Sequence, residues 1–154
     1  MKGRNSLPSN KRPHSPIIAE LPLGEKQKYF EWLLRTQPHV EKHLHLACVT
    51  YLRDYYPEVI TNHTRNQTTA HGNDLSVLYG YCKGYPDLFI ARKTKEYGGY
   101  FIEFKTPRSK YQVTTEQQYV HRILTEQGYL VDVIWTYQDF IEKVTRYLDE
   151  SFAN

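Results

Sequence analysis

Two short segments constrain the fold of this chain more than any other part of it. They are KGYPDLFI at residues 83–90 and FIEFKT at residues 101–106, and Glu103 follows Asp87 by sixteen positions. A Gly-x-Pro sequence breaks a helix and starts a strand, which leaves the acid that follows it at the beginning of that strand. Residues 88–91 and 100–102 are apolar and flank a polar, glycine-containing connection. The pattern predicts a β-hairpin with both acids near one end.

The second strand of this hairpin carries charged and apolar residues in alternation. In a strand, alternate side chains share one face. Glu103 and Lys105 therefore point one way, while Ile102 and Phe104 point the other way into a core. With Asp87 at the same end, two acids and an ammonium are expected to converge on one spot.

Such a cluster suits hydrolysis of a phosphodiester. A hard divalent cation such as Mg2+ binds through one or two carboxylates together with substrate phosphates. When bound, it polarises a phosphate and lowers the pKa of a bound water. Lys105 would then orient or activate that water, or stabilise charge on the attacked phosphate.

A solvated strand face is the simpler alternative, because a Glu-x-Lys triplet alone is common in a chain of this length. Two features favour the catalytic interpretation. The Gly-x-Pro sequence exposes Asp87 at a strand start, and the hairpin brings both acids to one end. A structural salt bridge does not need this arrangement.

Length, composition and charge limit the number of domains and the kinds of partner to expect. With 154 residues, of which 40% are hydrophobic, the chain is expected to form one domain with a substantial core. Its net charge of +3 permits a polyanionic partner without requiring one. Bases outnumber acids between residues 92 and 122, although a charge run is usually a solvated face. The predicted DNA contacts are Arg108, Lys110, Arg92 and Lys83.

Cysteine and histidine placement argues against other metal centres. Cys48 and Cys82 are single and widely separated, so neither a disulfide framework nor a four-cysteine iron-sulfur cluster is expected. His63, His71 and His121 fit no zinc-ligand spacing. With no long apolar stretch and no signal peptide, we expect a soluble intracellular protein, in the cytoplasm or nucleus, without a membrane partner.

Periodicity and capping signals outline the remaining elements. Residues 1–24 are predicted to be a disordered basic arm, and residues 25–154 a single α/β domain. Thr114 and Gln117 form a capping-box sequence that starts a helix ending at Gly128. The predicted order is α-β-β-α-β-α. Along the chain, the predicted elements are helices at 25–35 and 39–56, a polar loop at 61–73, a helical turn at 74–79, the hairpin, the capped helix, a strand at 129–135 and a last helix capped by Thr136.

Several stretches of the chain resemble a known family. The residues that carry the likeness are, in order, Gly80 and Gly84 with Pro86-Asp87-Leu88, the run from Ile102 to Pro107, the capping sequence from Val113 to Gln117, and Leu124 with Gln127-Gly128-Tyr129. Together, over residues 41–148, they resemble the VRR-NUC (virus-type replication-repair nuclease) branch of the PD-(D/E)xK superfamily, especially its small standalone phage and viral members. The resemblance implies a restriction-endonuclease-like mixed sheet flanked by helices. It further implies cleavage of branched DNA dependent on Mg2+, or Mn2+ in its place, with four-way junctions as substrate and a homodimer as the acting species.

The same resemblance assigns roles to residues of the hairpin. Asp87 and Glu103 match the metal-binding acids, and the main-chain carbonyl of Phe104 would be a further ligand. Lys105 matches the catalytic lysine.

Two helical residues complete the implied site. Gln117 matches the glutamine that lines it, and Glu41 matches the glutamate of the amino-terminal helix that completes the metal site. Four residues after that glutamate the family usually has Gln, where this chain has His45. A histidine beside an apolar stripe is more often structural, so His45 is not taken as a ligand.

Three other functions remain open. One is a non-cleaving DNA-binding module, although such a module has no need to keep like charges side by side. Another is a sequence-specific restriction-type endonuclease, although a domain this small has little surface left to read bases. The third is a flap or end-processing repair nuclease.

Overall fold

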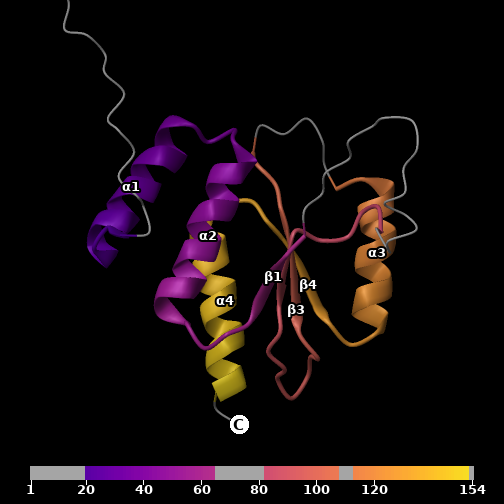
Figure 1. Ribbon diagram of the computed structural model, residues 1–154. Coiled ribbons are helices and arrows are strands. Elements are labelled where there is room, and N and C mark those ends of the chain that lie inside the picture. Colours follow the sequence, from indigo (N-terminus) through magenta and orange to yellow (C-terminus); the bar gives the residue numbers. More distant parts are fainter. Residues whose placement is uncertain (1–19, 65–81, 108–112, 153–154) are drawn as a thin grey trace, which may run out of the picture.

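A four-stranded mixed sheet separates two helical layers of unequal size. The structure is a computed structural model that describes residues 20–64, 82–107 and 113–152. The strands are β1 (Thr61–His63), β2 (Leu88–Ile90), β3 (Tyr100–Phe104) and β4 (Leu130–Ile134), in that spatial order. The helices are α1 (Leu23–Thr36), α2 (Glu41–Tyr55), α3 (Thr115–Glu126) and α4 (Tyr137–Phe152). In Figure 1, α2 and α4 cover one face of the sheet, α3 covers the other, and α1 lies outermost against α2.

Strand directions follow from the connections. β2 and β3 pair antiparallel, as the predicted hairpin requires, with Leu88 opposite Ile102. β3 and β4 pair parallel, with Glu103 opposite Val133. A parallel pair needs a crossover connection, and α3 provides it. The helix is thereby drawn against the face of the sheet from which Glu103 projects.

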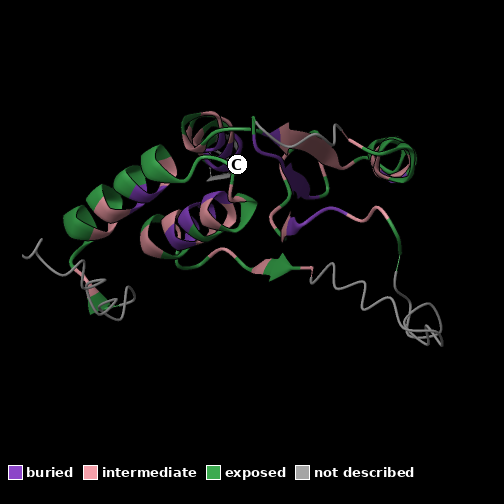
Figure 2. Ribbon diagram, turned by 90° about the horizontal axis from the view of Figure 1, so that it is seen from above, coloured by how far each residue is buried: buried purple, intermediate pink, exposed green. Residues whose placement is uncertain are grey.

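β3 is the most enclosed strand, because all five of its residues are buried. Ile102 and Phe104 belong to the main core with α2 and α4, whereas Phe101 packs against Tyr129 and Phe89 on the opposite face. Figure 2 shows the buried residues gathered where the sheet meets the helices. The strand that carries the candidate acid is therefore held from both sides.

Most predicted elements are present, with bounds shifted by a few residues. The capping box is formed, since the Thr114 side chain accepts from the Gln117 N–H while the Gln117 side chain accepts from the Thr114 N–H. Thr136 caps α4 through its side chain, which accepts from the Asp139 N–H at 3.1 Å. The first helix starts at Leu23, so the last two residues assigned to the basic arm are helical. The rest of that arm up to residue 19, and the helical turn predicted at 74–79, lie outside the described residues.

The prediction of a loop from residue 61 was wrong at its start. Thr61–His63 is an edge strand that pairs antiparallel with β2. Hydrogen bonds from Ala91 N–H to the Ile60 carbonyl and from Thr64 N–H to the Asp87 carbonyl, both 2.9 Å, extend this pairing. The strand is polar and largely exposed, so it lacks the apolar alternation on which the prediction relied. The predicted element order therefore lacked one strand.

The cysteines and the helices bear on the predicted cellular environment of the protein. Both cysteines are free thiols, with Cys48 buried in the core and Cys82 exposed. Across the three described segments, we find no helix whose length and hydrophobicity would suffice to cross a bilayer.

The burial of β3 gives a direct test of the core. Ile102 is fully buried, whereas Ile60 is 73% exposed. Ile102→Ala should lower the free energy of unfolding by about 2 to 5 kcal/mol, because it leaves a cavity under α2 and α4. Ile60→Ala should change it by less than about 0.5 kcal/mol. Urea unfolding followed by circular dichroism measures both, and equal losses in the two variants would contradict this description of the core.

Candidate active site

Asp87 and Glu103 lie next to each other at one end of the β2–β3 hairpin. Because Leu88 is opposite Ile102, Asp87 comes opposite Glu103 in the same register. The Asp87 Oδ2 accepts a hydrogen bond of 2.9 Å from the Phe104 N–H. This bond fixes the first carboxylate on the backbone of the strand that bears the second.

Glu103 is a carboxylate held almost entirely out of water. Its side chain is 1% exposed, and its Oε1 receives the Lys105 ammonium at 2.6 Å. Burial, and then the charge of Asp87, raise the pKa of Glu103 to about 7, against the lowering effect of Lys105. A carboxyl in this environment is stabilised as an anion by any additional positive charge that reaches it.

Gln117 connects this carboxylate to the start of α3. Its side-chain nitrogen donates to the Glu103 Oε1, and its side-chain oxygen accepts from the Thr114 N–H at 2.9 Å. Glutamine therefore serves the capping box and the site at once. A glutamate at this position would place a second negative charge against Glu103. The neighbouring Gln118 donates instead to the Val113 carbonyl.

Glu41 lies at the edge of the cluster formed by Asp87, Glu103 and Lys105. It is the first residue of α2 and remains exposed. Partial desolvation raises the pKa of its carboxyl, Lys105 lowers it and Asp87 raises it. Glu41 is therefore within electrostatic range of both Lys105 and Asp87, and its part in a metal site stays a prediction.

Two histidines support the backbone of the hairpin. The His63 Nδ1 makes a 3.1 Å hydrogen bond with the Asp87 carbonyl. The His45 ring packs between His63 and Phe104, with ring centroids 4.3 and 4.6 Å away. Burial and then His63 lower the pKa of His45 to about 4. These contacts suit the structural role expected for His45, and the contribution of His63 could not be recognised without β1.

His121 was set aside in the sequence because its spacing fits no zinc site, yet the structure brings it to Glu103. Its Nε2 lies 4.0 Å from the Glu103 Oε2. Burial and then the charge of Lys105 lower the pKa of His121. Its position one helical turn after Gln117 was the only sequence signal that could have found it.

The predicted DNA contacts are distributed unevenly. Lys83 is exposed and forms an ion pair of 2.6 Å with Glu116, close to the start of α3. Arg92 follows β2 at the opposite end of the hairpin, five residues from Asp87, which corresponds to roughly 15 Å along an extended chain. The structure does not bring it to the acids. Arg108 and Lys110 lie outside the described residues.

The donor set fits a hard divalent cation bound by two carboxylates. Asp87 and Glu103 are adjacent, and the buried Oε2 of Glu103 has no hydrogen-bond partner among the described residues. Within the described segments, no three His, Cys, Asp or Glu side chains come close enough together to hold a metal ion. Two carboxylates and the predicted Phe104 carbonyl do not require a third such side chain, since Mg2+ commonly keeps several waters.

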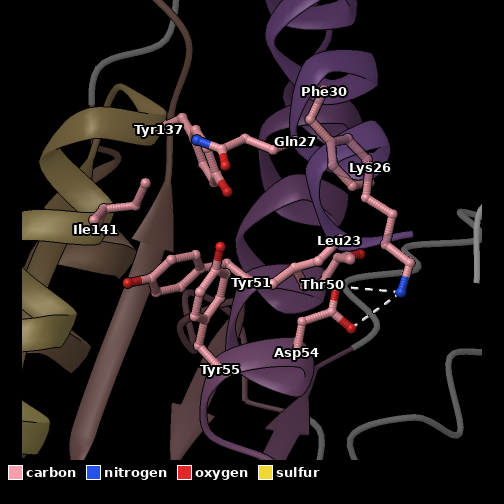
Figure 3. Close-up of a pocket in the computed structure, with 10 residues that line it drawn as sticks. All are labelled: Leu23, Lys26, Gln27, Phe30, Thr50, Tyr51, Asp54, Tyr55, Tyr137 and Ile141. Carbon is pink, nitrogen blue, oxygen red and sulfur yellow. Dashed lines mark hydrogen bonds and ion pairs between the residues drawn. The ribbon is translucent and has the colours of Figure 1, made fainter. Parts of the chain in front are cut away.

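A cavity elsewhere in the molecule is too small to compete as a site. Figure 3 shows it among α1, α2 and α4, with an ion pair of 3.2 Å between Lys26 and Asp54 at its edge. Its volume of about 30 Å3 leaves room for little more than a water molecule. It also lies on the side of the sheet away from α3.

Comparison with known proteins supports the fold. Neither a family model nor a curated protein matches the chain. A solved structure titled "VRR_NUC domain protein" superposes with a TM-score of 0.57 at 22% identity, over 71% of this chain and 88% of that one. The chain has a VRR-NUC fold. The predicted α/β class, a mixed sheet flanked by helices, is thereby confirmed. Because the identity is only 22%, the likeness shows the VRR-NUC fold alone.

Gly84 fixes the approach of the Asp87 segment to α3 in this VRR-NUC fold. It has φ +85°, and a Cβ there would lie 2.6 Å from the Glu116 carbonyl carbon and 2.8 Å from the Gln117 nitrogen. Only a residue without a side chain allows this contact, which brings the loop before Asp87 against the turn that carries Gln117.

Gly128 supplies a matched control for this contact. It also has φ +85°, but a methyl group added there would meet no atom of the described residues within 4 Å beyond its chain neighbours. Gly128→Ala should cost only the backbone strain of about 1 to 2 kcal/mol. Gly84→Ala should cost about 1 to 3 kcal/mol more, because the methyl group forces α3 and the loop apart. Equal losses in the free energy of unfolding, measured in urea, would show that the contact is unimportant.

Proposed function

We propose that this protein is a metal-dependent deoxyribonuclease that hydrolyses phosphodiester bonds. The observation that carries the proposal is the arrangement around Glu103, a buried carboxylate adjacent to Asp87 with Lys105 at 2.6 Å. Lys105 brings one positive charge to two adjacent carboxylates, so a bound divalent cation would relieve the repulsion that remains between them. The VRR-NUC fold of the solved neighbour supports the same conclusion, since its name denotes a nuclease domain.

Each residue has a distinct part in the proposed reaction. Asp87, Glu103 and the Phe104 carbonyl would hold Mg2+ or Mn2+, with Glu41 adding negative charge at the edge. The bound cation would polarise the scissile phosphate and lower the pKa of a water. Lys105 lies beside Glu103, where its ammonium can orient that water or stabilise charge on the phosphate. Gln117 holds Glu103 in place.

Branched DNA is the substrate that we propose, with a four-way junction as the preferred form. The family resemblance supports this choice. A small domain also offers little surface for reading bases, which favours recognition of DNA shape and backbone. The described residues of one chain form one such site, whereas resolving a junction takes two nicks on opposed strands. A two-fold homodimer would supply two sites with the symmetry of the junction.

Substitution of the site residues separates cleavage from binding. Asp87→Asn, Glu103→Gln and Lys105→Ala should each reduce cleavage by orders of magnitude. The first two weaken the proposed cation site, and the third removes the ammonium that would orient the water or stabilise charge on the phosphate. Junction affinity should change little, because phosphate contacts elsewhere supply most of the binding free energy. EDTA should abolish wild-type cleavage, and Mg2+ or Mn2+ should restore it.

The matched control is Glu126→Gln, which removes an exposed carboxylate of α3 that pairs with Arg122 at 3.1 Å. It should cleave as the wild type does. Cleavage that persists in EDTA would contradict the metal-dependent mechanism. A folded variant that loses binding together with cleavage would indicate a DNA-binding module instead.

The oligomeric state and substrate are tested together. Labelled four-way junction, flap and linear duplex are incubated with the protein, whose mass in solution is measured by light scattering. We expect a homodimer that cuts the junction in symmetric pairs and leaves linear duplex largely intact. Heterodimers of wild type with a tagged Glu103→Ala subunit should nick one strand only.

A monomer that prefers flaps or single-strand ends would make a repair nuclease the better account. Cleavage of linear duplex at a fixed sequence would favour a restriction-type endonuclease.

A further inference from the structure

The two oxygens of the Glu103 carboxylate have different surroundings. Oε1 receives both Lys105 and Gln117, whereas Oε2 is buried and has no hydrogen-bond partner among the described residues. The His121 Nε2, which faces it at 4.0 Å, is likewise buried and without a hydrogen-bond partner in the described part of the chain. The two side chains are 1% and 14% exposed.

This separation suits one bridging atom better than direct contact. At 4.0 Å the two atoms are too far apart for a hydrogen bond. A water about 2.8 Å from each would span the distance. Because buried polar atoms left unsatisfied are costly, a group that bridges the two is stabilised there.

The position of His121 on α3 explains how it reaches the carboxylate. It follows Gln117 by one turn, so both side chains project from the same face of the helix. Gln117 is fixed by the capping box at the start of that turn. The helix thereby presents one side chain to each oxygen of a single carboxylate.

We propose that His121 is a positioning residue for the cation site. Through a bridging water, His121 holds the Oε2 of Glu103 in the orientation that a divalent cation needs. The inference rests on the proposed function, since it assigns the cation to Asp87 and Glu103. Groups that orient a metal-binding carboxylate in this way typically change metal affinity by roughly 10- to 100-fold. The alternative is that His121 only fills space between α3 and the sheet.

Cation binding without DNA tests this assignment. The dissociation constant for Mn2+ is measured by isothermal titration calorimetry for wild type, His121→Ala and His121→Gln. We expect His121→Ala to weaken binding about tenfold or more. His121→Gln keeps a side-chain N–H and should recover most of the affinity, which a space-filling role does not predict.

Arg122→Ala is the control, because this neighbouring residue of α3 has an exposed side chain paired with Glu126. It should bind Mn2+ as the wild type does. Wild-type affinity in a folded His121→Ala variant, or equal losses in the Ala and Gln variants, would overturn the inference while leaving the nuclease proposal intact. A wild-type protein that neither binds Mn2+ nor cleaves DNA would overturn both.

Discussion

The burial of the Glu103 carboxylate is the constraint on which the rest of the site depends. Removing an ionised carboxylate from water costs several kcal/mol unless charged partners and hydrogen bonds compensate for it. Lys105 supplies the charge from two residues further along the chain, and Gln117 supplies a hydrogen bond from α3. The crossover helix and the strand are thus held together by a polar contact as well as by apolar packing.

The local geometry of this site follows from the pairing of the strands. Antiparallel pairing sets Asp87 beside Glu103, and parallel pairing with β4 places the crossover helix over the acid. β1 adds support from the outer edge, where His63 and Thr64 bind the carbonyl of Asp87. A shift of one residue in the register of β3 would turn Glu103 and Lys105 to the apolar face.

The sequence predicted those parts of the molecule that rest on local chemistry. The Gly-x-Pro turn, the alternation through Ile102, Glu103 and Phe104, and the capping box are each determined by neighbouring residues, and the structure contains them. β1 could not be predicted, because a polar edge strand exists only by backbone pairing with a partner distant in the sequence. The approach of His121 to Glu103 depends on how α3 packs on the sheet, which no local pattern specifies. The catalytic roles of these residues remain predictions.

The double use of Gln117 has a consequence for the dynamics of the protein. One amide group satisfies the first turn of α3 through its oxygen and the buried carboxylate through its nitrogen. Helix ends normally fray independently of the rest of a domain. Here fraying of that turn would release Glu103, and loss of the Glu103 contact would weaken the cap. Order at the helix terminus and order at the site therefore form one cooperative unit, so amide exchange in the first turn of α3 reports on the integrity of the site.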